Sequence, residues 1–189
     1  MNTVKFDDIA KTFDERVRKI VWCTFTTLDT SGRPFSRVLH PIWEGRVGWV
    51  GTGRHTLKTK HLAVNPNVAL FYWTTEHDTV MVRCRAEWAD DADTKQRIWN
   101  LLKSTPEPVG YDPILFWKGG VTDPTFGVLE LTPSRIELWS VAEMRPASRE
   151  RSGPRSQPPQ SGRTSFQPVK KRARFAHSTA SSRDAASMM

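Results

Sequence analysis

The stretch WCTFTTLDTSGRPFSRVLHPIWEGRVGWVGT, residues 22–52, decides the fold. Residues 22–28 are rich in aromatic and β-branched side chains, which favour strands, and residues 29–34 have the composition of a turn. A second strand-like run, 35–43, follows, and a short turn separates it from a third, 47–52. Three such strands joined by tight turns predict an antiparallel meander.

Helical and strand patterns surround this meander. Phe6, Ile9, Phe13, Val17 and Ile20 recur at helical spacing, which predicts an amphipathic helix. Composition predicts further elements downstream: a short helix at 56–64, strands at 68–73 and 79–88, a helix that begins at Asp90 or Asp91, and strands at 126–131 and 136–140. About seven strands with two or three helices and short links predict a mainly β (α+β) domain, a small antiparallel barrel with helical insertions.

The positive charge of the chain belongs to its C-terminal part. The 189 residues have a net charge of +8, but residues 1–145 carry 19 Lys and Arg against 18 Asp and Glu, and residues 146–189 carry 9 against 2. Few large apolar side chains occur there, so no core can form. We predict one folded domain over 1–142 and a disordered basic tail over 143–189. The tail either has no set function or, through residues 170–174, binds nucleic acid or an import receptor.

The sequence also indicates where the protein works. It has no apolar run near the ~20 residues that span a bilayer, and its N-terminus lacks the apolar segment of a signal peptide. Cys23 and Cys84 are too few and too far apart for a disulfide framework or a zinc site. We therefore expect a cytoplasmic protein with reduced, buried cysteines and no membrane association.

Familiar catalytic motifs are absent from the sequence. There is no Gly-x-Ser-x-Gly, no His-Glu-x-x-His, no phosphate-binding loop and no Gly-x-Gly-x-x-Gly after a strand. Asp90, Asp91 and Asp93 stand at a helix start, where carboxylates favour the positive end of the helix dipole, so we expect capping and no metal site. No catalytic side chain is assigned, and any chemistry is expected to depend on a cofactor.

Basic residues near the predicted turns are the candidates for holding a cofactor. Arg37 lies in the second strand, Thr52 ends the third, and Lys58 opens the short helix, with Lys60 two residues on. The meander would bring Arg37 to the loop between Thr52 and Lys58. Cations, a hydroxyl and free N–H groups at a helix start can hold a phosphate. Ordinary surface cations would give the same pattern, so both interpretations stay open.

Ordered motifs along residues 8–141 add a resemblance. They are Gly32-x-Pro34-x-Ser36-Arg37-Val38, Gly48-Trp49-Val50-Gly51-Thr52, Lys58-x-x-x-Leu62-x-x-Asn65-Pro66-x-Val68-x-Leu70, Phe116-Trp117-Lys118-Gly119-Gly120, Asp123-Pro124, and Leu131-Thr132-Pro133-x-x-Ile136-Glu137-Leu138-Trp139. With them the chain resembles the pyridoxamine 5'-phosphate oxidase-like flavoproteins, and in particular their general-stress-protein branch.

The resemblance implies a split β-barrel that binds FMN at a homodimer interface. The cofactor-binding residues it implies are Arg37 and Lys58 for the phosphate, Lys60 as a weaker candidate, Thr52, and the backbone of Val38, Leu39 and His40 for the isoalloxazine ring. Trp139 would either approach the cofactor from the partner subunit or pack in the core.

The activity implied is a flavin-dependent oxidoreductase acting on an unknown small molecule. One alternative is the deazaflavin F420, whose acidic tail would meet the basic strip of Arg54, His55, Lys58 and Lys60. Another is a non-enzymatic flavin-binding stress protein. True pyridoxamine phosphate oxidases carry an Arg-x-His substrate element after the last strand, but Ser140 to Met144 stand there in this chain. That departure argues against vitamin B6 oxidation.

Overall fold

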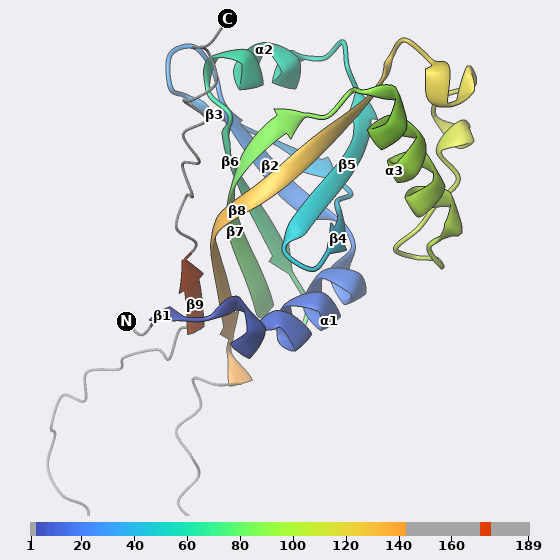
Figure 1. The fold of residues 1–189 in the computed structure, drawn as a ribbon. Helices are drawn as coiled ribbons and strands as arrows, with labels where there is room; N and C mark the ends of the chain where they lie inside the picture. Colours follow the sequence, from blue (N-terminus) through green and yellow to red (C-terminus); the bar gives the residue numbers. More distant parts are fainter. Residues whose placement is uncertain (1–2, 143–170, 175–189) are drawn as a thin grey trace, which may run out of the picture.

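The structure is a computed structural model that describes residues 3–142 and 171–174 (Figure 1). The helices are α1 (Ala10–Ile20), α2 (Leu57–Val64) and α3 (Ala92–Ser104), with 3-10 turns η1 (Phe6–Asp8), η2 (Pro113–Leu115) and η3 (Gly120–Thr122). The strands are β1 (Thr3–Val4), β2 (Cys23–Leu28), β3 (Pro34–Leu39), β4 (Ile42–Glu44), β5 (Val47–Gly53), β6 (Asn67–Trp73), β7 (Asp78–Trp88), β8 (Phe126–Ser140) and β9 (Lys171–Arg174). No helix in this described part is long and apolar enough to cross a membrane.

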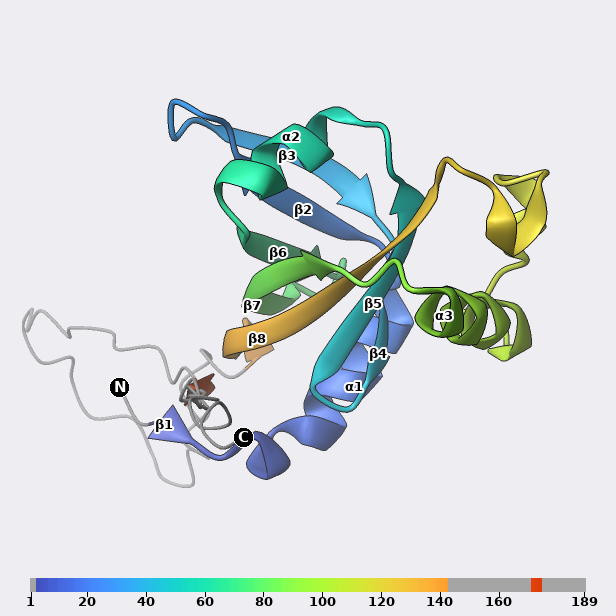
Figure 2. The same cartoon turned by 45° about the horizontal axis from the view of Figure 1, so that its top comes forward.

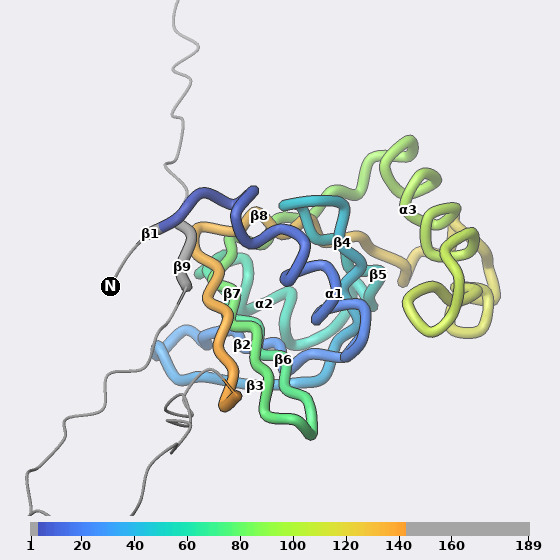
Figure 3. Tube along the Cα trace, turned by 90° about the horizontal axis from the view of Figure 1, so that it is seen from below, coloured from blue at the N-terminus to red at the C-terminus, as the bar shows by residue number. Residues whose placement is uncertain are grey.

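One sheet curls into an open barrel. Its strands follow the order β1-β9-β8-β7-β6-β2-β3, while β5 pairs with β8 and β4 pairs with β5. The strands from β2 to β8 are antiparallel wherever they pair. The predicted mainly β architecture, an antiparallel split barrel with two to three helices, is confirmed. Helix α1 lies at one end of the barrel and α2 at the other (Figure 1), and the view from below shows α1 across the mouth (Figure 3).

The core follows from alternation along the strands. Val68, Leu70 and Tyr72 of β6 point inward and are buried, whereas the residues between them are exposed, as a period of two requires. The inward residues meet Phe13 and Val17 of α1 in the main cluster inside the barrel. A second buried cluster fills the space between β5, β8 and α3, which lies outside β5 (Figure 2).

The strand predicted over 35–43 is divided in the structure. β3 ends at Leu39 and β4 begins at Ile42, because Pro41 between them has no N–H to offer a ladder. In the described part of the chain β3 pairs with β2 alone, and β4 pairs with the first half of β5. The predicted three-strand meander is therefore wrong at this link. On the side away from β8, Val50–Gly53 has no strand partner among the described residues, and β3 has none beyond β2.

β8 is one continuous strand where the sequence predicts two strands and a turn. It pairs with β7 from Leu129 to Ser140, and the register shifts opposite Pro133, between Arg83 and Cys84. A bulge of this kind accommodates a proline, which cannot donate to the ladder. The gap that the sequence predicts between the strands 126–131 and 136–140 is therefore a bulge within one strand and not a turn between two.

Most of the predicted tail, residues 143–189, lies outside the described residues, so the domain boundary stays a prediction. The exception is 171–174, which forms β9 and pairs with Arg135–Leu138 of β8 and with β1. Composition did not predict this strand. Its physical basis is main-chain hydrogen bonding to an open sheet edge, which requires no apolar core of its own.

Both cysteines are free and buried, as predicted. Cys23 lies in β2 and Cys84 in β7. Burial raises the pKa of the Cys23 thiol to about 12, against the smaller opposing effect of a hydrogen bond with Tyr72. A thiol held this far from its thiolate form is a weak nucleophile, so the pair is part of the core rather than of a reactive site.

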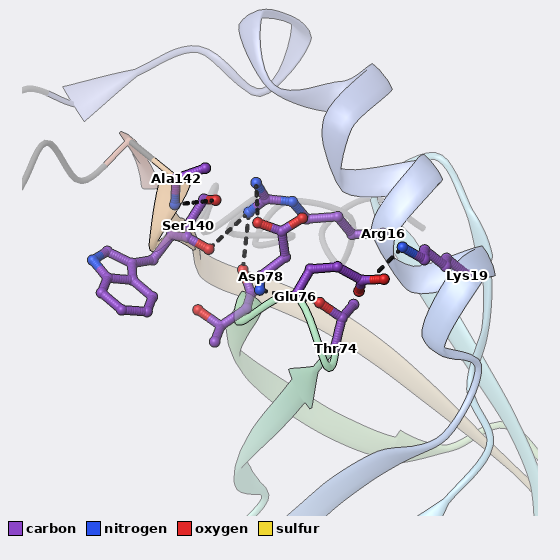
Figure 4. Close-up of polar contacts among 9 residues, drawn as sticks. Arg16, Lys19, Thr74, Glu76, Asp78, Ser140 and Ala142 are labelled. Atoms are coloured by element: carbon purple, nitrogen blue, oxygen red, sulfur yellow. Dashed lines mark hydrogen bonds and ion pairs between the residues drawn. The ribbon is translucent and has the colours of Figure 1, made fainter. Parts of the chain in front are cut away.

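Arg16 fastens α1 to the barrel (Figure 4). Its Nη1 donates to the carbonyl oxygens of Thr79 at 3.2 Å and Trp139 at 3.0 Å, and Nη2 lies 3.4 Å from Asp78 Oδ1. Only 12% of the Arg16 side chain is exposed, whereas Lys19, which pairs with Glu76 at 3.2 Å, is 60% exposed. The contacts of Arg16 are thus shielded from water, whereas the Lys19–Glu76 pair is not.

We expect Arg16→Met to lower the free energy of unfolding by about 1.5–3 kcal/mol, the range for hydrogen bonds to a charged group. The matched variant Lys19→Met removes an exposed pair and should cost less than about 1 kcal/mol. Urea denaturation followed by tryptophan fluorescence measures both. Equal losses for the two variants would show that Arg16 contributes no more than a surface pair.

Candidate functional site

Arg37 lies on the inward side of β3, directly opposite the buried Phe25 of β2. Its Nη2 donates to Thr27 Oγ1 at 2.9 Å, and the guanidinium carbon lies 5.1 Å from the centre of the Phe35 ring. Nη1 is buried and has no hydrogen-bond partner. The side chain is therefore held in one position with one nitrogen still able to donate.

Thr27 and His61 complete the support for Arg37, and the sequence did not identify either of them as site residues. Thr27 is fully buried on β2, and its hydroxyl lies 2.8 Å from His61 Nδ1 of α2. The Phe35 ring also meets the His61 ring edge-on, with centroids 5.9 Å apart. Thr27 follows the apolar residues Cys23 and Phe25 at a spacing of two, which places all three on the inward side of β2. A polar residue at such a position was the signal available in the sequence.

Lys58 is the second cation of this site, and it is 5% exposed. Its Nζ donates to the Gly53 carbonyl at 3.1 Å and to Thr56 Oγ1 at 2.7 Å. An ammonium group has three donors, so one N–H remains after these two bonds. Burial, and after it the charge of Arg37, lowers the pKa of Lys58 to about 8. Within the described residues, neither cation forms an ion pair with a carboxylate.

The N-terminus of α2 lies beside Lys58. Its N-cap residue, Thr56, makes no side-chain cap: its hydroxyl donates to the Gly53 carbonyl at 3.2 Å and accepts from Lys58 Nζ at 2.7 Å. The first N–H groups of the helix therefore keep the partial positive charge that favours anions. Thr52 is the second-last residue of β5, before Gly53, and is buried, with 5% exposure.

The structure does not gather every residue that the sequence proposed. Lys60 is exposed, unlike the buried Lys58, and lines two surface hollows, because residues two apart on a helix point in different directions. Trp139 lies near the end of β8, opposite Thr79 and partly exposed. Within one chain it is therefore several strands away from Arg37 on β3.

His40 stands where β3 ends, beside the break before β4. Its ring lies between Trp22 and Tyr111, with centroids 4.9 and 5.2 Å away. The side chain is 8% exposed and its Nε2 is buried without a partner. Burial lowers the pKa of His40, against the smaller effect of a hydrogen bond with the Val109 backbone. The imidazole is thus neutral at pH 7 and has one unused nitrogen.

The arrangement is suited to a phosphate monoester on an extended group. Arg37 and Lys58 are two neighbouring cations with unused donors, and the uncapped end of α2 adds partial positive charge. Next to them, β3 and Val50–Gly53 of β5 present main-chain edges without strand partners in the described structure. An anion would reduce the repulsion between the cations, and a flat group could lie along the edges.

Solved structures with this fold are known from several bacteria. A protein related to general stress protein 26 from Clostridium acetobutylicum superposes with a TM-score of 0.60 at 16% identity, over 71% of this chain and 89% of that one. A putative general stress protein 26 from Jannaschia sp. CCS1 gives 0.59 at 15% identity, over 89% and 99%. A pyridoxamine 5'-phosphate oxidase-related, FMN-binding protein from Nostoc punctiforme gives 0.53 at 14%, over 75% and 88%. These likenesses establish the split-barrel class.

The family follows from the sequence itself. The family model described as pyridoxamine 5'-phosphate oxidase matches residues 9–140. The chain therefore belongs to the pyridoxamine 5'-phosphate oxidase family, as its motifs indicated. None of the curated proteins matches it.

Proposed function

We propose that the protein is a flavin-dependent oxidoreductase that binds FMN in the split of the barrel, with the phosphate on Arg37 and Lys58. One observation carries the proposal: Arg37 has a buried Nη1 without a hydrogen-bond partner, the charge of Arg37 adds to burial in lowering the pKa of Lys58, and no carboxylate pairs with either cation in the described part. Bound phosphate would form charge-assisted hydrogen bonds with both cations and offset the cost of burying them.

The remaining predicted residues take places around that phosphate. The N–H groups of α2 and the Thr52 hydroxyl would complete its shell, and Lys60 would add only a screened charge from the surface. Backbone of Val38, Leu39 and His40 on one edge and of Gly51 and Thr52 on the other would border the ring. Bound FMN would supply hydride or electron transfer, while the chain binds it, orients it and limits its contact with water. The Nostoc punctiforme relative, described as FMN-binding, supports this choice of cofactor.

The outer face of the sheet supports a homodimer. Val38 on β3, Thr24 on β2 and Phe71 on β6 lie side by side across three strands. Val38 is 63% exposed, Phe71 41% and the neighbouring Trp73 51%. An apolar face of this kind on a soluble protein commonly contacts another chain. A second copy would cover this face, and the partner's Trp139 would approach the flavin.

The test is an absorbance spectrum of the purified protein before and after addition of FMN or F420, with sedimentation to measure its mass. We expect a two-banded flavin spectrum with FMN and a dimer. A single deazaflavin band would favour F420, although Arg54 of the basic strip is already paired with Asp90 at 2.7 Å. Bound flavin with no turnover of any acceptor would favour a non-enzymatic stress protein. Binding of neither cofactor by folded protein would overturn the proposal.

FMN affinity should depend on pH through Lys58. Its pKa is about 8 in the free protein, and a bound phosphate dianion must raise that value. The lysine is therefore protonated in both states below pH 8, and above it the free protein must take up a proton on binding. We expect the association constant to fall by up to about tenfold per pH unit above pH 8. Riboflavin, which has no phosphate, is the control, and an equal pH dependence for it would contradict the assignment.

A further inference from the structure

The edge of β8 is covered by a strand from the C-terminal part of the chain (Figure 1). Residues Lys171–Arg174 form β9, which pairs antiparallel with Arg135–Leu138 of β8. On its other side β9 pairs in parallel with β1, Thr3–Val4. β9 is therefore an inner strand at this point of the sheet, and in the described part of the chain it is the one strand that joins β1 to the barrel.

The attachment of β9 depends mainly on main-chain hydrogen bonds, because its sequence, Lys-Arg-Ala-Arg, offers little apolar surface for burial. Each such bond makes only a small net contribution in water, since the free strand is hydrogen-bonded to solvent. Ordering the residues of the strand opposes docking, and so does closing the long connection, residues 141–170, between β8 and β9. A strand held in this way can leave and return while the barrel stays folded.

β8 itself is held in place without β9. It pairs with β7 from Leu129 to Ser140, and the inward side chains of Ile136 and Leu138 are buried in the main core cluster. Alternate residues of an antiparallel strand direct their N–H and C=O groups to the same neighbour, so half of the residues in 135–138 present these groups to β9. An edge that keeps this geometry when a strand leaves is a template for another extended segment.

We propose that the edge of β8 at Arg135–Leu138 binds residues 171–174 reversibly, and that it accepts this segment from a second copy of the chain as well as from its own. Recognition is the addition of a strand to a sheet, in which the main chain provides most of the affinity. The same segment of a second copy therefore offers the edge the same hydrogen bonds. This docking site is independent of the proposed flavin site.

Amide hydrogen exchange of the full-length, ¹⁵N-labelled protein tests the release of β9. Ala173→Pro removes an N–H from the middle of a strand that has partners on both sides, so docking should be lost. Exchange at the residues of 135–138 that bond to β9 should become about tenfold faster or more, while the residues between them, which bond to β7, keep their rates. Exchange in β1 should rise as well. Ala180→Pro, the same replacement outside the described residues, is the control and should leave all these rates unchanged.

An unlabelled synthetic peptide of residues 169–176 tests binding from a second molecule. Added to labelled Ala173→Pro protein, it should restore slow exchange at the same β8 amides in a saturable manner. The same peptide with Ala173→Pro should give no protection at equal concentration. Wild-type protein should need more peptide, because its own segment competes from an effective concentration on the order of mM.

Three results would overturn the proposal. Unchanged exchange at 135–138 in Ala173→Pro would mean that β9 does not cover this edge. Faster exchange that neither peptide reverses, or that both reverse equally, would mean that the edge does not accept the segment from a second copy. Wild-type edge amides that exchange only as slowly as the core amides of β6 would mean that β9 is released only when the whole barrel unfolds. None of these measurements involves a cofactor, so they leave the flavin proposal untouched.

Discussion

Lys58→Ala weakens FMN binding by about 1.5–3 kcal/mol, which is a loss of roughly tenfold to more than a hundredfold in affinity. The expected loss is this large because the ammonium group is buried, fixed by Gly53 and Thr56, and adjacent to Arg37. A screened surface cation would contribute far less. Fluorescence titration with FMN measures the effect.

Lys60→Ala is the matched control for this prediction. It removes the same charge from the same helix, but from a side chain that is exposed. Its effect should be a small, salt-dependent loss, because exposed charges are screened over about 10 Å at 0.1 M salt. Equal losses of FMN affinity in Lys58→Ala and Lys60→Ala would mean that the phosphate interacts only with the overall charge of α2 and makes no specific contact with Lys58.

Phe25→Ala has the largest expected effect on stability, a loss of about 3–5 kcal/mol in the free energy of unfolding. Phe25 is completely buried in the main core cluster. It also stands on β2 directly opposite Arg37. Truncation removes apolar contacts and leaves a cavity beneath the strand that positions the guanidinium. Guanidinium chloride denaturation measures the loss, and FMN affinity should fall as well in the protein that remains folded.

Phe116→Ala provides the comparison, because this side chain is 65% exposed and truncation leaves no enclosed cavity. We expect it to change the free energy of unfolding by less than about 1 kcal/mol. If Phe25→Ala were as mild as Phe116→Ala, the interior of the barrel would not be packed as described.

Local patterns were sufficient to predict most elements of the barrel. The expected helix start at Asp90 or Asp91 is confirmed, since Asp91 caps α3 by accepting from the Thr94 N–H at 2.9 Å. Strand composition placed β6 and β7 to within a residue or two. The prediction failed at Pro41, where aromatic and apolar residues continue on both sides and the ladder changes partner. Which strand pairs with which is a non-local property that composition does not contain.

The site was predictable to a similar extent. Arg37 and Lys58 were named from their places near a turn and a helix start, and the structure does bring them together. The contacts that bring them together differ from those expected. The sequence predicted a pairing of β3 with β5, whereas in the structure His61 of α2 hydrogen-bonds to Thr27, which in turn accepts from Arg37. His40, whose Nε2 is buried without a partner, has its ring between Trp22 and Tyr111. These residues come from separate segments, so no sequence motif could have shown this arrangement.

A crystal structure of the protein grown with FMN tests the central claim most directly. The account predicts phosphate oxygens within hydrogen-bond distance of Arg37 Nη1 and Lys58 Nζ, with the ring along the free edges of β3 and β5. FMN bound at another surface, with Arg37 Nη1 still unpartnered and Lys58 still turned toward Gly53, would contradict it.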